Sequence, residues 1–133
     1  MATIFSRIIA GEIPCHKVAE DKDFIAFLDI RPINGGHTLV VPKVETDYLF
    51  DLSDDVLSRM LVFAKKVAGA IKEVVECKRI GLMVIGLEVP HAHIHLIPIN
   101  SEADMFNKAR VEWDKEKLSL LAAQIRETSS NLI

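Results

Sequence analysis

The chain has 133 residues, a formal net charge of −3 and a hydrophobic content of 50%. These values fit one soluble, globular domain over residues 1–133, with enough apolar side chains for a real core. The sequence has no Lys/Arg-rich run, which weighs against a nucleic acid or an anionic membrane as the main partner. A mononucleotide is not excluded, because a small site can hold a phosphate inside an acidic protein.

Cysteine use and the N-terminal segment indicate the compartment. Cys15 and Cys77 do not form a C-x-x-C pair, and two cysteines in a chain of this length do not suggest a disulfide scaffold. We interpret both as buried or incidental thiols, because an unpaired Cys commonly behaves as a small hydrophobic residue. The first residues lack the basic start and apolar core of a signal peptide, and no apolar run approaches the roughly 18–20 residues that span a bilayer. We therefore expect a cytoplasmic protein.

The N-terminal third predicts a short helix followed by three strands. Thr3 can cap a helix whose apolar residues recur with helical spacing, and Gly11 stands where helices end. Residues 15–20 and 23–29 are typical of two strands joined by a tight turn. A loop rich in Pro, Asn and Gly then leads to a β-branched strand over residues 37–41.

The remaining two thirds predict two helices around a second pair of strands. A long amphipathic helix is expected over residues 53–76, because a serine followed by two aspartates is a strong helix start. Strands are expected over residues 79–86 and 91–99, and a last helix from Asp114. The final residues, 128–131, are typical of a frayed tail. Strands interrupted by long helices predict an α+β fold with an antiparallel sheet.

Three of the five histidines fall within five positions, in the run His91-Ala92-His93-Ile94-His95. Strand side chains have period two, so this alternation predicts three imidazoles on one face, about 6.5–7 Å apart along the strand. Side-by-side imidazoles repel when charged, and burying them unpaired costs free energy, so a purely structural role is disfavoured. Such a cluster could surround one small anionic group.

Two functional interpretations of this cluster remain open. Histidines in a His-x-His pattern on a strand can hold zinc, with His37 or an acidic residue as a further ligand. Alternatively, a neutral imidazole is a nucleophile near pH 7, and its neighbours can donate hydrogen bonds to phosphate oxygens and protonate a leaving group. The first interpretation predicts a metal-binding protein, and the second predicts an enzyme that acts on phosphate.

The run 91–97 resembles the signature H-φ-H-φ-H-φ-φ of the histidine-triad (HIT) family, where φ is apolar. Order and spacing agree from residue 3 to about residue 98, which leaves residues 99–133 as a C-terminal extension. The resemblance implies the HIT-like fold, with about five antiparallel strands, one long helix, a short N-terminal helix and a C-terminal helix. Segments similar to the family's opening helix, central hairpin and third strand are 4–14, 26–32 and 36–43.

By matched position, the resemblance implies that His93 is the nucleophile that forms a nucleotidyl-histidine intermediate. His91 and His95 would contact the α-phosphate oxygens and help protonate the leaving group, and His37 would support them by hydrogen bonding. Asp29 would accept hydrogen bonds from the ribose hydroxyls, which suits a carboxylate that only accepts. The residues implied to line the purine pocket are Phe5, Ile8, Phe27 and Ile30.

The implied activity is that of a Hint-like, bacterial-type nucleotide hydrolase or nucleotidyl transferase. Its substrates would be purine nucleotide derivatives such as adenosine phosphoramidates, cleaved at the α-phosphate to release an AMP-type product. A histidine at position 95, where other branches of the family have Gln, favours the hydrolases over the transferase and DNA-repair branches. The family also implies a homodimer around the long helix and a central strand, and no cofactor. A nucleotide-binding regulatory or interaction module with little activity stays an alternative.

The link before the triad departs from the family pattern. In many Hint-like and Fhit-like members this link is longer and has a Gly-Gln-Ser/Thr stretch that reaches the phosphate and the leaving group. Here the link is only residues 86–90, without Gln, Ser or Thr, and Ile85 stands where an Asn is expected. The resemblance therefore does not supply the contacts to the leaving group or the part of the substrate beyond the nucleotide. Glu88, close to the triad, could disfavour anionic leaving groups.

A second departure concerns zinc. Some bacterial members of the family bind a structural zinc ion through an N-terminal C-x-x-C and histidines. The matching places here hold Ala2 or Thr3 and Ser6, which cannot supply the thiolates. No metal is therefore predicted.

Overall fold

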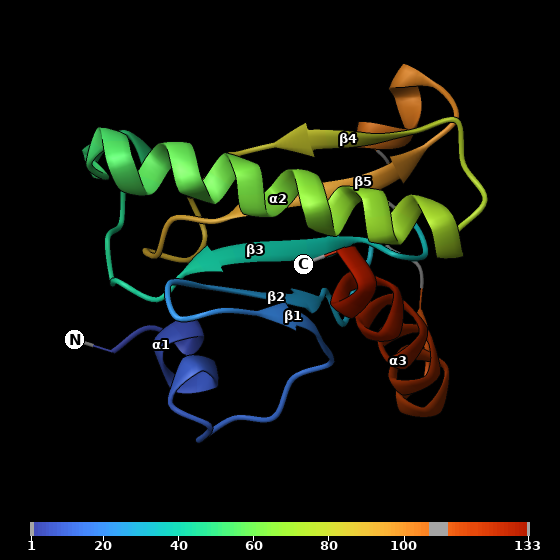
Figure 1. Ribbon diagram of the computed structural model, residues 1–133, viewed down its shortest axis with the longest axis horizontal. Coiled ribbons are helices and arrows are strands. Elements are labelled where there is room, and N and C mark those ends of the chain that lie inside the picture. Colours follow the sequence, from blue (N-terminus) through green and yellow to red (C-terminus); the bar gives the residue numbers. More distant parts are fainter. Residues whose placement is uncertain (1, 107–111, 133) are drawn as a thin grey trace.

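A computed structural model of the chain describes residues 2–106 and 112–132. Five strands form one antiparallel sheet, paired in the order β1-β2-β3-β5-β4 (Figure 1). The strands are β1 (Lys17–Glu20), β2 (Phe24–Leu28), β3 (Thr38–Pro42), β4 (Arg79–Met83) and β5 (Ile94–Ile99). The α+β fold and the five-stranded antiparallel sheet expected from the sequence are confirmed.

Three helices accompany the sheet, and the starts of the first two follow from their capping residues. Thr3 caps α1, because its Oγ1 accepts a hydrogen bond from the Ser6 N–H at 3.0 Å. Ser53 caps α2 in the same way, because its Oγ accepts a hydrogen bond from the Val56 N–H at 3.2 Å. The helices are α1 (Ile4–Ile9), α2 (Asp54–Val74) and α3 (Lys115–Leu132), with short 3-10 turns η1 (Leu49–Asp51) and η2 (Glu102–Phe106). Within the described ranges, no helix combines the length and the apolar character that a membrane crossing requires.

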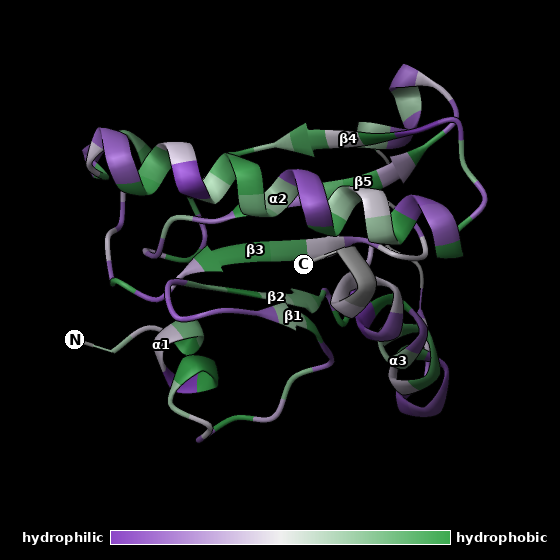
Figure 2. Ribbon diagram, in the orientation of Figure 1, coloured by the Kyte–Doolittle hydropathy of each residue, from purple (hydrophilic) through white to green (hydrophobic). Residues whose placement is uncertain are grey.

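The sheet separates two apolar cores. On one face α2 and α3 pack together against the strands, through buried residues such as Met60, Ile71 and Ile125. On the other face Phe5 of α1 packs against a smaller cluster from β2 and β3. Residues along β2 and β3 alternate between the two cores, because successive strand side chains point to opposite faces. Figure 2 shows that β3 is apolar along most of its length.

The C-terminal helix is longer than the sequence indicates, since α3 runs to Leu132 and the frayed tail predicted for residues 128–131 is wrong. Two of its side chains bind the edge strand β1. Arg126 Nη1 donates to the Lys17 carbonyl at 2.7 Å, and Ser129 Oγ donates to the Val18 carbonyl at 3.1 Å. These bonds satisfy two carbonyl groups of the edge strand, against which α3 packs. A local pattern does not reveal them, because the partners are 109 and 111 positions apart.

The strands expected over residues 79–86 and 91–99 are shorter than predicted. β4 ends at Met83, and β5 begins at Ile94. The link between them is irregular and contains Gly86 with a φ of 75°, a backbone conformation that favours glycine. This link forms one wall of the cavity described below.

The first two histidines of the triad therefore precede β5, and the prediction that all three lie on one strand is wrong. Pairing of β3 with β5 ends at Val40 opposite Ile94. Two positions further on it would bring Pro42 opposite Ala92, and proline has no N–H for a ladder hydrogen bond. The Ala92 N–H donates instead to the Thr46 carbonyl at 2.7 Å.

Candidate active site

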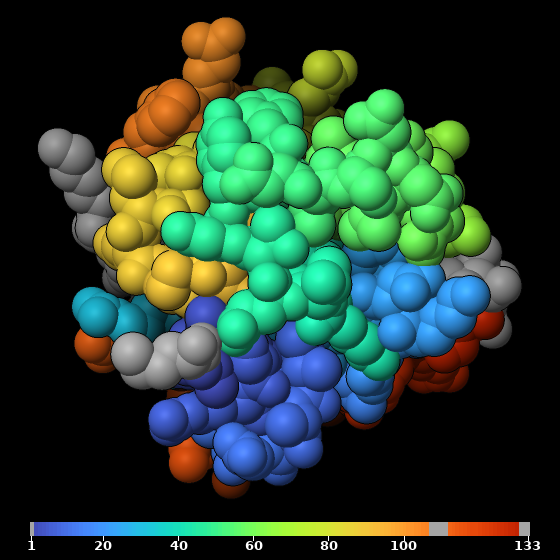
Figure 3. Space-filling view, turned by 90° about the vertical axis from the view of Figure 1, so that its left-hand side faces the viewer, coloured from blue at the N-terminus to red at the C-terminus, as the bar shows by residue number. Residues whose placement is uncertain are grey.

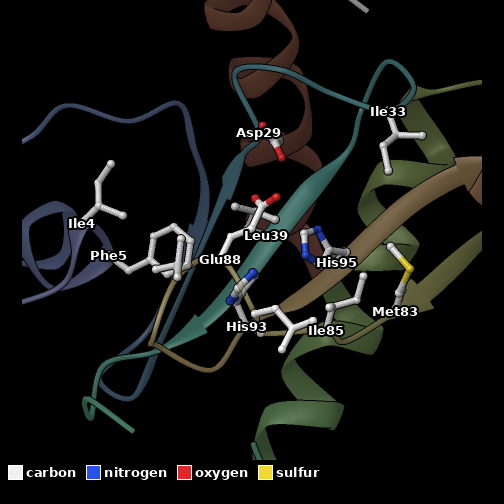
Figure 4. Close-up of a pocket in the computed structure, with 13 residues that line it drawn as sticks. Ile4, Phe5, Asp29, Ile33, Leu39, Met83, Ile85, Glu88, His93 and His95 are labelled. Carbon is white, nitrogen blue, oxygen red and sulfur yellow. The ribbon is translucent and has the colours of Figure 1, made fainter. Parts of the chain in front are cut away.

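A cavity of about 380 Å³ lies between α1, the sheet and the link from β4 to β5 (Figure 4). Its walls are mostly apolar, and two histidines and two carboxylates supply the ionisable groups. Such a chamber, with few convergent polar groups, is typical of a small-molecule site. The lining residues are Ile4, Phe5, Asp29, Ile33, Leu39, Met83, Ile85, Gly86, Leu87, Glu88, Val89, His93 and His95.

His93 is the best placed nucleophile of the lining. The residue is 5% exposed, and its Nδ1 lies 2.7 Å from the carbonyl oxygen of His91. Because a carbonyl oxygen only accepts, Nδ1 carries the hydrogen and Nε2 keeps its lone pair in the neutral ring. Burial lowers the pKa of His93, and the hydrogen bond to His91 and the charges of Asp29 and Glu88 oppose that shift. The net effect favours a neutral, nucleophilic ring.

His95 lies on β5, with its ring centroid 4.8 Å from that of His93. Behind it, the fully buried His37 accepts from the Ile33 N–H at Nδ1 (3.0 Å), and its Nε2 lies 2.9 Å from Nδ1 of His95. Since His37 accepts at Nδ1, its hydrogen is on Nε2 in the neutral ring and is donated to His95. His95 then carries its own hydrogen on Nε2, on the far side of its ring. The pair thus supplies a hydrogen-bond donor beside the nucleophile.

His91 is not among the lining residues, so the expected face of three imidazoles reduces to two. Its ring is fully buried, with Nε2 donating to the Pro42 carbonyl at 2.8 Å and Nδ1 accepting from the Thr3 hydroxyl at 2.9 Å. The Thr3 backbone N–H and the Ser6 hydroxyl both donate to the Glu45 carboxylate. Figure 3 shows the three chain segments involved together on one side of the molecule: the N-terminus, the segment after β3 and the segment before β5. From the sequence, Thr3 is predicted only as a helix cap.

Asp29 directly follows β2, and its side chain is partly buried. One carboxylate oxygen accepts a hydrogen bond from the Arg31 N–H at 2.9 Å, and the other lies 3.8 Å from Nε2 of His37. Ligand atoms of Asp29, His37 and His95 lie within 4.8 Å of one another, which makes them a possible ligand set for a metal ion. A metal bound through the two facing ring nitrogens would replace the hydrogen between them.

The residues expected to form a purine pocket occupy different positions. Phe5 lines the cavity, and Phe27 packs edge-to-face against it with ring centroids 5.7 Å apart. Ile8 packs against the same cluster, whereas Ile30 is 65% exposed and is not among the lining residues. The cavity has other apolar lining residues that were not predicted from the sequence. An apolar residue is more often part of a core than of a binding site, so its type alone does not indicate that it lines a cavity. The lining residues missed for this reason include Ile33, Leu39, Met83 and Val89.

Comparison with known proteins identifies the family. The HIT domain family model matches residues 10–102. The chain is 38% identical over 110 residues to the protein hit of Bacillus subtilis (strain 168), covering 77% of this chain and 74% of that protein. It is 39% identical over 103 residues to an adenosine 5'-monophosphoramidase of Schizosaccharomyces pombe, covering 77% of each. The crystal structure of a Hit-like protein involved in cell-cycle regulation from Bartonella henselae has a TM-score of 0.82 at 33% identity, covering 95% of both chains.

The five-stranded sheet and the His-x-His-x-His run that ends beside the cavity define a histidine-triad protein. The chain belongs to the HIT family, which confirms the resemblance carried by the sequence.

Proposed function

We propose that this protein is a nucleotide hydrolase or nucleotidyl transferase that acts at the α-phosphate of purine nucleotide derivatives, such as adenosine phosphoramidates. The observation that carries the proposal is the hydrogen bond from Nδ1 of His93 to the His91 carbonyl, which leaves Nε2 unprotonated at the cavity. The relative in Schizosaccharomyces pombe is named an adenosine 5'-monophosphoramidase, which supports a nucleotide substrate of this class.

The reaction has two steps. In the first, Nε2 of His93 attacks the α-phosphorus in line with the leaving group. A bond from phosphorus to Nε2 forms and the bond to the leaving nitrogen breaks; that nitrogen keeps the electron pair and takes a proton from solvent. In the second step, water attacks the phosphorus of the nucleotidyl-histidine and loses a proton to solvent. The electron pair of the phosphorus–nitrogen bond returns to His93, and the nucleoside monophosphate is released.

The other site residues position the substrate in this scheme. His95 donates from Nε2 to a non-bridging phosphate oxygen, and His37 fixes the tautomer that allows it. His91 acts through its carbonyl oxygen, which holds the ring of His93. Asp29 accepts hydrogen bonds from the ribose hydroxyls. Of the purine contacts that the family resemblance implies, Phe5 lines the cavity and Phe27 packs against its ring, so we propose that Phe5 contacts the base; Ile8 and Ile30 lie outside the lining.

Turnover of an adenosine 5'-phosphoramidate by the His93→Ala variant tests the proposal. We expect a loss of at least about 1000-fold, because no other group replaces the nucleophile. Intact-mass measurement after rapid quenching should detect an AMP-sized adduct on the wild-type protein and none on the variant. His16→Ala is the control, since His16 lies outside the cavity lining, and it should keep wild-type turnover. Unchanged turnover in His93→Ala would overturn the assignment.

A nucleotide-binding module with little activity is a second candidate. The observation that favours it is the link of residues 86–89, which lines the cavity without a Gln, Ser or Thr side chain to hold a leaving group. Calorimetry with AMP, combined with turnover on the same preparation, separates the two candidates. AMP binding without product or adduct would favour the module.

We also propose a homodimer through α2 and the edge strand β4. Leu61 and Val62 on α2 are 55% and 54% exposed, and Leu82 on β4 is 48% exposed. All three line one apolar groove between the helix and the strand, and Figure 2 shows apolar stretches on both elements. An apolar face next to an open strand edge suits a second copy, which would cover the side chains and the edge together.

A further inference from the structure

Glu88 lies on the link between β4 and β5 and lines the cavity together with Asp29, His93 and His95. Figure 4 shows the carboxylates of Glu88 and Asp29 directed into the same space as the two imidazole rings. A phosphate anion is repelled, not attracted, by a carboxylate, so Glu88 has no part in holding the α-phosphate. Its position beside the nucleophile points to another part of the substrate.

The two carboxylates of the cavity are held differently. Asp29 accepts from the Arg31 N–H at 2.9 Å, and its other oxygen lies 3.8 Å from Nε2 of His37. Glu88 is exposed and stands on an irregular link, two positions after Gly86 with its φ of 75°. A fixed carboxylate suits a constant part of the substrate such as the ribose. An exposed one on an irregular link suits a part that varies, which is the leaving group.

The charge of the cavity determines which leaving groups it favours. Among the described residues that line it, none is Lys or Arg. A leaving group with its own phosphate or carboxylate would therefore be repelled by Glu88 without a compensating cation from that lining, whereas an ammonium group would be attracted. Glu88 is within electrostatic range of the reacting ring: burial lowers the pKa of His93, and the charge of Glu88 is one of those that oppose this shift.

We infer that Glu88 is a specificity-determining residue that selects nucleotides whose leaving group is an amine with a further positive charge, against leaving groups that carry phosphate or carboxylate. The inference rests on the proposed hydrolase function. As the phosphorus–His93 bond forms, the bond to the leaving nitrogen breaks, and that nitrogen takes a proton from solvent and departs as part of a cation. Glu88 stabilises this cation and forms no covalent bond.

Three adenosine 5'-phosphoramidates with leaving groups of equal length test the inference. Their four-carbon chains end in an ammonium, a hydroxyl or a carboxylate. For the wild-type protein we expect kcat/KM for the ammonium compound to exceed that for the carboxylate compound by about tenfold or more, with the hydroxyl compound between them. Glu88→Gln should reduce this ratio to about twofold, and Glu88→Lys should invert it.

Glu73→Gln is the matched control, because Glu73 is an exposed carboxylate on α2 outside the cavity lining. It removes the same charge from the molecule and should keep the wild-type ratio. The inference is overturned if Glu88→Gln retains the wild-type ratio, or if Glu73→Gln lowers the ratio equally.

A binding measurement separates this inference from the proposed function. Calorimetry on His93→Ala, with and without Glu88→Gln, gives the affinities of the same three compounds without turnover. Failure of the wild-type protein to turn over any of them refutes the proposed hydrolase, and the affinities still decide the role of Glu88. A preference for the ammonium compound that disappears with Glu88→Gln supports the inference. The same order of affinities in both proteins overturns it.

Discussion

The hydroxyl of Thr3 lies 2.9 Å from Nδ1 of His91, which joins the cap of α1 to the segment before the nucleophile. Because Nε2 of His91 donates to the Pro42 carbonyl, Nδ1 is the acceptor in the neutral ring and the hydroxyl is the donor. The backbone carbonyl of His91 in turn accepts from Nδ1 of His93. The N-terminal helix cap and the orientation of the nucleophile therefore belong to one hydrogen-bonded chain.

Thr3→Val removes the donor from this chain while keeping the shape of the side chain. We expect the free energy of unfolding to fall by about 1–3 kcal/mol, because Nδ1 of the buried His91 loses its partner and α1 loses its cap. Urea unfolding measures the change. Thr3→Ser, which retains the hydroxyl, is the control and should stay within about 0.5 kcal/mol of the wild type. Equal midpoints for the three proteins would contradict the role given to the hydroxyl.

His37→Phe keeps a buried ring but removes the donor to His95. We expect kcat to fall by about 10- to 100-fold, because His95 loses the hydrogen bond that places its own hydrogen on Nε2. KM should change little, since the residues proposed to bind the nucleoside are retained. Nitrogen NMR of the histidine rings should report a changed tautomer for His95. His16→Phe is the control, and a wild-type kcat in His37→Phe would exclude the proposed role of the pair.

The acidic limb of kcat/KM should lie below pH 6.5, because burial lowers the pKa of His93 from 6.5 and protonation removes the nucleophile. At a pH between the lowered pKa of His93 in the folded protein and its ordinary pKa in the unfolded chain, the unfolded chain binds more protons than the folded protein. The contribution of His93 to the free energy of unfolding is therefore fully present above its unfolded pKa. This contribution is lost as the pH falls from the unfolded pKa to the lowered folded pKa.

An NMR titration of His93 and a pH–rate profile measure this effect. The charge of Glu88 opposes the shift, so Glu88→Gln should move the limb to lower pH, while Glu73→Gln should leave it in place. A limb above pH 6.5 would contradict the environment assigned to His93.

The wild-type protein should sediment as a dimer of the 14.9 kDa chain, through the groove between α2 and β4. Leu61→Glu places a charge in that groove and should give a monomer, because burying an unpaired carboxylate is costly. Leu120→Glu is the control, since Leu120 is 64% exposed on α3 and does not line the groove. A monomeric wild-type protein would refute the proposed dimer. A Leu61→Glu variant that remains dimeric would show that the interface lies elsewhere.

The possible ligand set of Asp29, His37 and His95 permits a test of the expectation that no metal takes part. Dialysis against a chelator should leave turnover unchanged, because the proposed steps use none. Added zinc should lower turnover, because ligation by the facing ring nitrogens displaces the hydrogen that His37 donates to His95. Stoichiometric metal in untagged protein, with activity lost on its removal, would indicate a metal-dependent site instead.

Features that depend on near neighbours in the chain could be predicted from the sequence. Thr3 and Ser53 begin α1 and α2 because a capping side chain bonds to a backbone N–H three positions on. Short apolar, β-rich runs bounded by turn residues predicted β2 and β3, and the long amphipathic pattern predicted α2. Together with the histidine run, these local patterns were sufficient for the α+β fold and the HIT family.

The direction of each ring in the triad was decided by tertiary structure. Pro42 cannot continue the ladder to Ala92, so the chain leaves the sheet, and His91 turns to the Pro42 carbonyl and to Thr3, 88 positions away. Only His93 and His95 then line the cavity. A prediction from sequence periodicity assumes that a strand continues as long as its pattern does, and it considers one segment of the chain at a time. Hydrogen bonds between distant segments determine where the strand begins, which rings are buried and which face a substrate.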